Sequence, residues 1–443
     1  MLKIYDTLQH KEVELNFKPG QTVNFYSCGP TVYGFAHIGN LRTFISNDLL
    51  FRTLKANGVN VRWVMNLTDI DDKTINGTIA EFGSPATPEH LQTYTQRYTE
   101  KFMADLRAVG VNTENIEFIN ATDCIAEIQD FIVELINKGY AYTADDGSTY
   151  FSIEKYQADF HDYGSLVGEK FLEGKKVNAR IKNDEYEKDN LSDFALWKAW
   201  DDKDAQIFWE HPELGRGRPG WHIECSAINK LAFKGEVTHI HTGAVDLIFP
   251  HHTNEIAQSQ PLGPFVDNWV HFEHLLVDGK KMSKSLKNDY TLKDIEAKGF
   301  SGLDLRYLFF SSGYKAQSNF TWEALEAART GRLKLQNSVN DDSEINTDDR
   351  EKFVSTLNNN LNTAEALALV HQNKQNLKSY DKIINLGLSE KVLVEITDEV
   401  QELLNERQAA RDAKDFAKSD ELRDRIADLG FEVKDTPEGQ KIL

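Results

Sequence analysis

The sequence predicts an α/β protein in which a doubly wound parallel sheet carries an insertion and is followed by an all-α C-terminal domain. Strand-like and helix-like segments alternate through the first third of the 443-residue chain, a pattern typical of parallel sheets covered by helices. The alternation resumes over residues 220–310. After Phe320 the chain is polar and helical almost throughout, which favours a separate helical domain.

The first strand and the first helix meet at residues 37–40. Residues 22–26 have strand composition, whereas the apolar residues of 41–54 recur at nearly helical spacing. Residues 37–40 therefore stand at the start of a helix, where unpaired N–H groups and a partial positive charge favour a bound phosphate.

Three residues of this junction suit a nucleotide. His37 and Asn40 share one helix face, and Gly39 lets a flat ligand approach the backbone. For an isolated His-Ile-Gly-Asn segment, helix capping is nevertheless the ordinary interpretation, so the surrounding sequence has to decide.

The second strand, predicted within residues 59–65, leads into an acidic turn. Its carboxylates, Asp69, Asp71 and Asp72, lack the glycine and the closing glutamate of a calcium loop, so we interpret them as structural or substrate-positioning. In a doubly wound sheet, ligands bind beyond the carboxyl ends of the strands, where both Cys28 and Thr68 fall.

The remaining elements follow from periodicity and turn residues. We expect helices at 90–108 and 125–138, a hairpin of 140–143 with 148–151, and C-terminal helices at 350–372, 388–414 and 416–429. Residues 121–218 are predicted to be the insertion.

Composition limits the cellular setting and the partners. The first twenty residues are polar and charged, and no apolar run reaches about 18 residues, so we expect a cytoplasmic protein with no membrane span. We also expect a monomer. The net charge of −20 argues against indiscriminate nucleic-acid binding. Any RNA contact must therefore be local. The candidates are the basic residues of 170–182 and those of the C-terminal helices, and for either a solvated helix or loop face is the alternative.

Four residues form a mixed sulfur, nitrogen and oxygen set. They are Cys28, Cys225, His251 and Glu255, and this donor composition favours zinc. His251 and Glu255 are one helical turn apart, but the spacing alone does not choose His251 over His252. The two cysteines match no local zinc motif, so buried thiols and a capping histidine are the alternative on composition.

A lysine cluster follows the strand-like run 275–277. The segment from Asp278 to Ser285 carries Lys280, Lys281 and Lys284 after a glycine turn, and such a cluster is ordinarily a solvated loop.

Several segments occur in the order in which one known family has them. They read Cys28-Gly29-Pro30-Thr31-Val32-Tyr33, His37-Ile38-Gly39-Asn40, Gly220-Trp221-His222-Ile223-Glu224-Cys225-Ser226, Phe249-Pro250-His251-His252 and Lys281-Met282-Ser283-Lys284-Ser285. With them the chain resembles the cysteinyl-tRNA synthetases, a family of class I aminoacyl-tRNA synthetases, over nearly its whole length.

This resemblance implies an ATP-dependent ligase that activates L-cysteine to cysteinyl-adenylate and transfers it to tRNA(Cys). It implies one zinc ion, held by Cys28, Cys225, His251 and Glu255, that coordinates the substrate thiolate. It also implies that ATP binds with Mg²⁺ and is contacted by His37, Gly39, Asn40 and Lys284. The residues implied to be catalytic are His37, Asn40, Lys281 and Lys284. Those implied to contact cysteine are Gly29, Thr68 and Trp221.

The resemblance also divides the chain. It implies a Rossmann-like catalytic domain of residues 1–120 and 219–315, a connective insertion of 121–218, and a helical stem and anticodon-binding region of 316–443.

The chain also departs from the family pattern. Asn40 replaces the second histidine of the usual His-Ile-Gly-His. Where the family usually has Thr-Glu-His-Ile, this chain has Thr122-Asp123-Cys124-Ile125, and residues 313–317 differ from the usual His-Tyr-Arg-Ser-Pro. The alternatives are a tRNA-independent cysteine ligase of the same fold, which would lack an anticodon-binding region, and a non-catalytic zinc or RNA-binding relative, in which the His37 and Lys284 motifs would have decayed.

Overall fold

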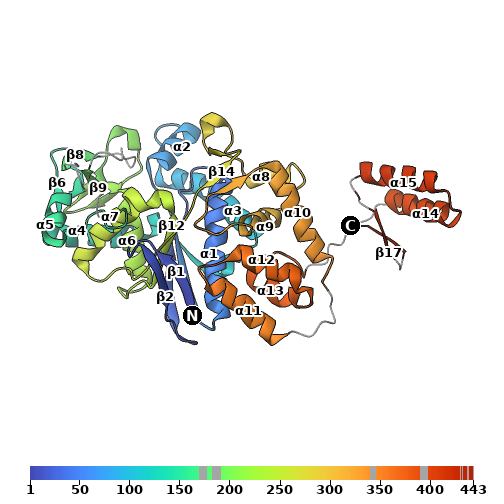
Figure 1. Cartoon of the computed structure of the whole chain (residues 1–443). Helices are drawn as coiled ribbons and strands as arrows, with labels where there is room; N and C mark the ends of the chain where they lie inside the picture. Colours follow the sequence, from blue (N-terminus) through green and yellow to red (C-terminus); the bar gives the residue numbers. More distant parts are fainter. Residues whose placement is uncertain are drawn as a thin grey trace.

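The computed structural model describes residues 1–168, 177–181, 191–339, 346–389, 398–429, 431, 433–436 and 439–442. A parallel sheet lies at its centre, where Figure 1 labels β12. The sheet has five strands in the order β13-β12-β3-β4-β5. They span Thr22–Ser27 (β3), Asn60–Leu67 (β4), Ile116–Asn120 (β5), Ile240–Ala244 (β12) and Trp269–Phe272 (β13). All neighbours are parallel, so the predicted fold class is confirmed.

The strand order reverses direction at the centre of this sheet. From β3 the chain builds outward through β4 and β5, and it then returns to the other side of β3 with β12 and β13. The crevice beyond the carboxyl ends of β3 and β12 is therefore the topological switch point, where doubly wound folds bind ligands. Cys28 lies there, and its backbone N–H donates to the carbonyl of Thr242 at 3.2 Å.

The helix α1, which spans Ile38–Ala56, is buried nearly all round. It lies between the parallel sheet and helices of the C-terminal half, so polar residues such as Asn47 and Asp48 are as buried as Leu41 and Ile45. Asp48 accepts from Arg306 of α9 and from Arg52, which supplies the charge pairing that a buried carboxylate needs.

Further helices cover the sheet. They are α2 (Asp72–Phe82), α3 (Pro88–Ala108), α6 (Trp221–Ala232), α7 (Thr253–Ser259), α8 (Leu292–Glu296), α9 (Gly302–Phe310) and α10 (Trp322–Gln336). Two small sheets pair β1 (Leu2–Asp6) with β2 (Lys11–Leu15), and β14 (Leu275–Val277) with β15 (Lys280–Lys281) and β16 (Ser318–Phe320).

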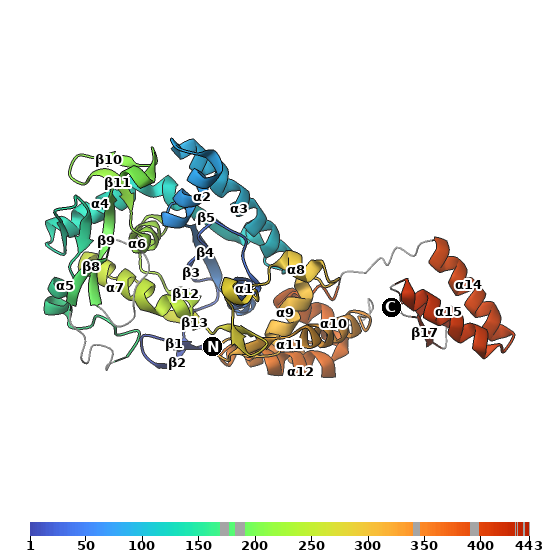
Figure 2. The same ribbon diagram turned by 90° about the horizontal axis from the view of Figure 1, so that it is seen from above.

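The insertion forms a second sheet. Its strands are β6 (Ala141–Thr143), β7 (Thr149–Phe151), β8 (Val177–Ile181), β9 (Leu191–Ala199), β10 (Trp209–His211) and β11 (Gly215–Pro219), accompanied by α4 (Ile125–Asn137) and α5 (Ile153–Phe160). The predicted hairpin is confirmed as β6 with β7, in the register Ala141 opposite Phe151. Viewed from above, this sheet and helix α10 lie on opposite sides of the parallel sheet (Figure 2).

An ion-pair cluster fastens the insertion to the start of α2. Lys198 of β9 and Arg218 of β11 are buried, and both bond to the carboxylate of Asp72, Lys198 at 3.0 Å. Although burial raises it, these two cations bring the pKa of Asp72 below its ordinary value. The acidic turn is thus structural, because Asp71 caps α2 and Asp69 accepts from Thr122.

The predicted helix of residues 350–372 is wrong in one respect, since it breaks in the middle. The structure has α11 at Thr347–Asn358 and α12 at Thr363–Gln372, with Asn360 and Leu361 between them at positive φ of 56° and 50°. The side chain of Asn360 accepts from the Tyr314 hydroxyl at 2.6 Å, and its backbone N–H donates to Lys3. These long-range contacts favour a turn over continued helix. Helix α13 (Leu377–Ile384) follows.

The last unit has a core of its own. Helices α14 (Asp398–Asp412) and α15 (Phe416–Asp428) pack through an apolar cluster that includes Leu403 and Leu422. The C-terminal region was expected to be all-α, but it ends in a hairpin of β17 (Val433–Thr436) and β18 (Gly439–Ile442). In the part of the chain that the structure describes, no helix has the length and apolar character needed to cross a membrane.

Arg407 of α14 joins the helices to this hairpin. Removal of the carboxylate that Arg407 bonds to should therefore destabilise the unit. Arg407 is buried and bonds to Asp435 at 2.8 and 3.1 Å, and Arg411 also contacts Asp435. We expect Asp435→Asn to lower the free energy of unfolding by about 0.5–1.5 kcal/mol, the net contribution of an ordinary hydrogen bond, because Asp435 is 41% exposed and solvent screens the pair. Urea unfolding followed by circular dichroism measures it, with Asp420→Asn, an exposed carboxylate of α15, as the control.

The same pair predicts an acid-sensitive unit. Hydrogen bonds from Arg407, together with Arg411, hold the pKa of Asp435 at about 2, below its value in an unfolded chain of about 3.9. The stabilisation is therefore present above pH 4 and is lost as the pH falls from about 4 to about 2. Asp435→Asn should abolish this part of the pH dependence.

Candidate functional site

The first predicted segment forms a reciprocal helix cap. His37 is the N-cap of α1, where its Nδ1 accepts from the backbone N–H of Asn40 at 3.1 Å and Asn40 Oδ1 accepts from the backbone N–H of His37 at 3.1 Å. The capping interpretation is thus correct for the local geometry. Burial lowers the pKa of His37, so the imidazole is neutral near pH 7. Asn40 nevertheless lines the cavity described below, so a capping residue also faces ligand space.

Gly39 brings the two signature segments together. A Cβ at Gly39 would collide with Cε of Met282, so the lysine loop rests directly on the start of α1. Lys281 is exposed, and its Nζ lies 3.7 Å from Asp246, which also accepts from His274 at 3.1 Å. Lys284 begins a short 3₁₀ turn, Lys284–Leu286, and its side chain lies outside the described residues.

A cavity of about 220 Å³ opens at the switch point. Its lining includes Cys28, Gly29, Asn40, Asn66, Trp221, Cys225, Asp246 and His251, which come from the loop after β3, the end of β4, the segment after β12, α1 and α6. The volume suits an amino acid. The cavity therefore joins the helix start of α1 to the predicted metal ligands.

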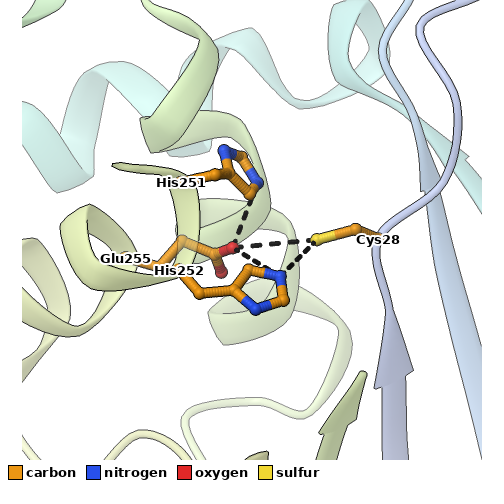
Figure 3. Close-up of side chains that lie close together, drawn as sticks. All are labelled: Cys28, His251, His252 and Glu255. Atoms are coloured by element: carbon orange, nitrogen blue, oxygen red, sulfur yellow. Dashed lines mark hydrogen bonds and ion pairs between the residues drawn. The ribbon is translucent and has the colours of Figure 1, made fainter. Parts of the chain in front are cut away.

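Four polar side chains converge at the base of this cavity (Figure 3). One ligand atom each of Cys28, His251, His252 and Glu255 lies within 4.8 Å of the others, and all four residues are buried. His251 Nε2 is 3.1 Å from Glu255 Oε1, which is 3.7 Å from Cys28 Sγ. Cys225 completes the predicted set, because its Sγ lies 3.8 Å from that of Cys28.

The cluster carries more negative than positive charge, so a cation would balance it. Although burial raises it, the pKa of Cys225 falls to about 6 because Cys28 donates to it and His251 lies beside it. Although burial raises it as well, His241 and His251 bring the pKa of Glu255 to about 2. Burial lowers the pKa of His251, but these two anions raise it to about 10. A thiolate and a carboxylate thus share one imidazolium, whose charge a divalent cation could replace.

The spacing of the donors fits a tetrahedral ion. Two thiolates bound at about 2.3 Å lie about 3.8 Å apart on a tetrahedral zinc ion, the separation found between Cys28 and Cys225. His252 competes for the nitrogen position, since its Nε2 is 3.2 Å from Cys28 Sγ and 3.8 Å from Glu255. The structure therefore brings the predicted ligands together and retains the alternative between His251 and His252.

Further histidines surround the cluster. His222 Nδ1 is 3.1 Å from His251 Nδ1, His271 Nε2 is 2.7 Å from His252 Nδ1, and His241 Nε2 is 3.0 Å from Glu255 Oε2. Such partners fix the ring orientation of metal-binding histidines. Sequence reasoning assigned no role to any of the three; the only signal was that His222 lies inside the Gly-Trp-His-Ile-Glu-Cys-Ser segment.

The three residues predicted to contact the cysteine substrate do not all line the cavity. Gly29 lines the cavity, where a Cβ would collide with the carbonyl of Asn66. Trp221 also lines it and stacks on His251, with ring centroids 4.4 Å apart. Thr68 lies behind them, buried, and its hydroxyl donates to Glu224 at 2.9 Å.

Comparison with protein families assigns two regions of the chain. Residues 15–330 match the catalytic domain described as "tRNA synthetases class I (C)", and residues 393–442 match the domain described as "Cysteinyl-tRNA ligase anticodon binding domain". The first match contains the whole cluster of Figure 3.

Individual relatives match over the full length. The chain is 40% identical to the cysteine–tRNA ligase of Chlamydia caviae, covering 100% of this chain and 97% of that protein. It is 41% identical to that of Chlamydia muridarum, covering 100% and 99%. Among solved structures, methionyl-tRNA synthetase of Mycobacterium tuberculosis with methionyl-adenylate has the same fold, with TM-score 0.54, 12% identity and coverage of 87% and 94%.

Proposed function

Since the chain belongs to the cysteine–tRNA ligase family, we propose that the cavity at the switch point is where L-cysteine is activated with ATP and then transferred to tRNA(Cys). The observation that carries this is the convergence of two thiols, imidazole and carboxylate on an amino-acid-sized cavity. A site for a thiol substrate needs a soft ligand-accepting ion, and this donor set suits one.

Cys28, Cys225, His251 and Glu255 would hold one zinc ion per chain. When bound, zinc accepts a further sulfur ligand and lowers the pKa of that thiol below about 8.5, so the substrate binds as thiolate. The protein supplies the rest. Trp221 closes the side of the cavity next to His251, and Gly29 lets the loop after β3 lie against the carbonyl of Asn66 at the cavity wall.

ATP is proposed to bind across the start of α1. The partial positive charge of this helix start favours the phosphates, and Gly39 offers a flat approach where Met282 now lies. The cysteine carboxylate attacks the α-phosphorus, pyrophosphate leaves with its Mg²⁺, and Lys281 and Lys284 balance the charge that develops. Asn40 offers a hydrogen bond but no charge, so the activation step relies more on these lysines for positive charge.

The acceptor end of the tRNA is proposed to enter beside Trp221. A second cavity, of about 560 Å³, adjoins the first at Thr31 and Trp221. Its charged lining is mixed: Lys73, Lys198, Lys203 and Arg218 stand with Asp71, Asp72, Asp201 and Asp204. The anticodon contact falls to the last unit. Arg407 and Arg411 there bond to Asp435, whereas Lys418 and Arg423 of α15 are exposed and pair with exposed carboxylates, Glu421 and Asp420, which RNA phosphates would displace.

Metal analysis tests the zinc site. We expect one zinc per chain in the purified protein, and near-complete loss of zinc and of cysteine-dependent ATP–pyrophosphate exchange in Cys225→Ser, because one of four ligands is replaced by a poor one. Cys124→Ser, which removes the buried thiol away from the cluster, is the control. Full zinc and full activity in Cys225→Ser would contradict the proposal.

The register of the histidine is tested separately. His252→Asn should keep zinc content near one per chain, whereas His251→Asn should lower it, since His251 is one helical turn from Glu255 and lies closer to it, at 3.1 Å, than His252 does, at 3.8 Å. The opposite result would assign the ligand to His252.

The alternatives are separated by charging assays. A cysteine ligase of the same fold that joins cysteine to an amino sugar would show cysteine-dependent exchange without forming cysteinyl-tRNA, and a non-catalytic relative would show neither. The match of residues 393–442 to an anticodon-binding domain favours tRNA as acceptor. The monomeric state and the cytoplasmic location stay predictions, for light scattering and for cell fractionation.

A further inference from the structure

A chain of hydrogen bonds runs behind the cavity through three side chains. The backbone N–H of Gly29 donates to Asn66 Oδ1 at 2.8 Å, Asn66 Nδ2 donates to Thr68 Oγ1 at 3.2 Å, and Thr68 Oγ1 donates to Glu224 Oε2 at 2.9 Å. Asn66 and Thr68 are each 1% exposed and Glu224 is 0% exposed. In this burial such bonds are strong and their loss is costly.

The two ends of this chain lie next to the two thiols. Gly29 follows Cys28 in the loop after β3, and Glu224 precedes Cys225 in α6. The links between them belong to β4 and its following loop, so three separate parts of the fold are connected. The 3.8 Å separation of the thiols therefore depends on the loop, β4 and α6 keeping their positions, and the hydrogen-bonded chain connects all three.

We propose that Asn66 and Glu224 are positioning residues for cysteine binding: they hold the Gly29 backbone and the Thr68 hydroxyl and thereby fix the spacing of Cys28 and Cys225. The inference rests on the proposed function, since it concerns the same cavity. Asn66 also lines that cavity, whereas Glu224 acts only through Thr68 and through its own helix.

The general need of buried polar groups for hydrogen bonds does not explain why a glutamate stands at position 224. Its Oε1 has no hydrogen-bond partner among the described residues, although the side chain is wholly buried. Stability alone would favour an apolar side chain or a fully bonded one at this position, because a buried carboxyl with an unused oxygen is costly. The direction of the hydrogen bonds from Gly29 to Glu224 gives Glu224 a role. The only hydroxyl hydrogen of Thr68 goes to Glu224, and Asn66 donates to the same oxygen, so the two residues together fix the orientation of Thr68 behind the cavity.

Two substitutions test the proposal. Asn66→Asp keeps the acceptor for Gly29 but replaces the donor to Thr68 by an acceptor. Glu224→Leu removes the acceptor for Thr68, and Glu224→Gln restores one. The control is Asn229→Asp, an equally buried and isosteric change in α6 whose Oδ1 already acts as an acceptor, for Thr238.

We expect Asn66→Asp and Glu224→Leu to raise KM for cysteine about tenfold or more in pyrophosphate exchange, with KM for ATP within about twofold, and Glu224→Gln to lie near the parent. Zinc content should stay at one per chain. In cobalt-substituted protein, the thiolate-to-metal absorption of Cys28 and Cys225 should shift in Asn66→Asp before any substrate is added, because the spacing of the two sulfurs changes.

Equal rises in KM for cysteine and for ATP, or rises matched by Asn229→Asp, would show a merely structural role and overturn the proposal. Unchanged KM values together with an unchanged cobalt spectrum would overturn it as well. Asn66→Asp, which keeps the side-chain volume, carries the test if Glu224→Leu does not fold. Failure of the proposed function is distinct, because then the parent protein itself would show no cysteine-dependent exchange.

Discussion

Serine should be activated about 10⁴–10⁵ times less efficiently than cysteine. A pocket that relies on size discriminates poorly between a hydroxyl and a thiol, whereas a site that rewards one specific bond reaches this range. In the proposed site, that bond is the one between the substrate thiolate and the zinc held by Cys28, Cys225, His251 and Glu255. A serine hydroxyl is a poor replacement because it ionises far above neutral pH and is a hard ligand.

Pyrophosphate exchange with serine, cysteine and alanine measures this discrimination. Alanine serves as the control, because it fits any cavity that admits cysteine but offers no ligand atom. Serine should be no better than alanine. A ratio of cysteine to serine below about 10², the level that an apolar pocket alone reaches, would contradict the prediction.

Selection at activation also predicts that mischarged tRNA is not hydrolysed. The described part of the insertion is a small sheet, β6–β11, with helices α4 and α5, and it is fastened to the catalytic half through Lys198 and Arg218. Hydrolysis of seryl-tRNA(Cys) by the enzyme should therefore be no faster than the uncatalysed reaction. Rapid release of serine would show that an editing site exists.

Lys284→Ala should slow cysteinyl-adenylate formation by about 10²–10³-fold, equivalent to about 2.7–4 kcal/mol, the loss measured when one donor to a developing anion is removed. A cation offered to the departing pyrophosphate acts chiefly in the transition state, so KM for cysteine should hardly change. The loop of Lys284 contacts the start of α1 through Met282 and Gly39, which is where ATP is proposed to bind.

Rapid-quench measurement of adenylate formation gives the rate of this step. Lys280→Ala is the matched control, since Lys280 is exposed on β15 in the same loop and has no proposed role. An unchanged activation rate with a raised KM for ATP would mean that the loop only binds the nucleotide.

The sequence by itself determined the features that depend on neighbouring residues. The cap of His37 with Asn40 spans three positions, the hairpin of β6 with β7 has a short turn, and His251 reaches Glu255 over one helical turn. Strand and helix periodicity likewise predicted the parallel sheet. Local hydrogen bonds and side-chain spacing fix such features, so a linear pattern is enough to predict them.

Only the tertiary structure decided the features that join distant segments. Cys28 and Cys225 are 197 residues apart, and they come within 3.8 Å because the strand order reverses between β3 and β12. The break at Asn360 follows from contacts with Tyr314 and Lys3, which override the helical pattern of residues 350–372. No sequence pattern marks Asn66, because its proposed role depends on the groups that folding places on either side of its side-chain amide. Such contacts depend on how whole elements pack, and packing over these separations leaves no periodic trace in the sequence.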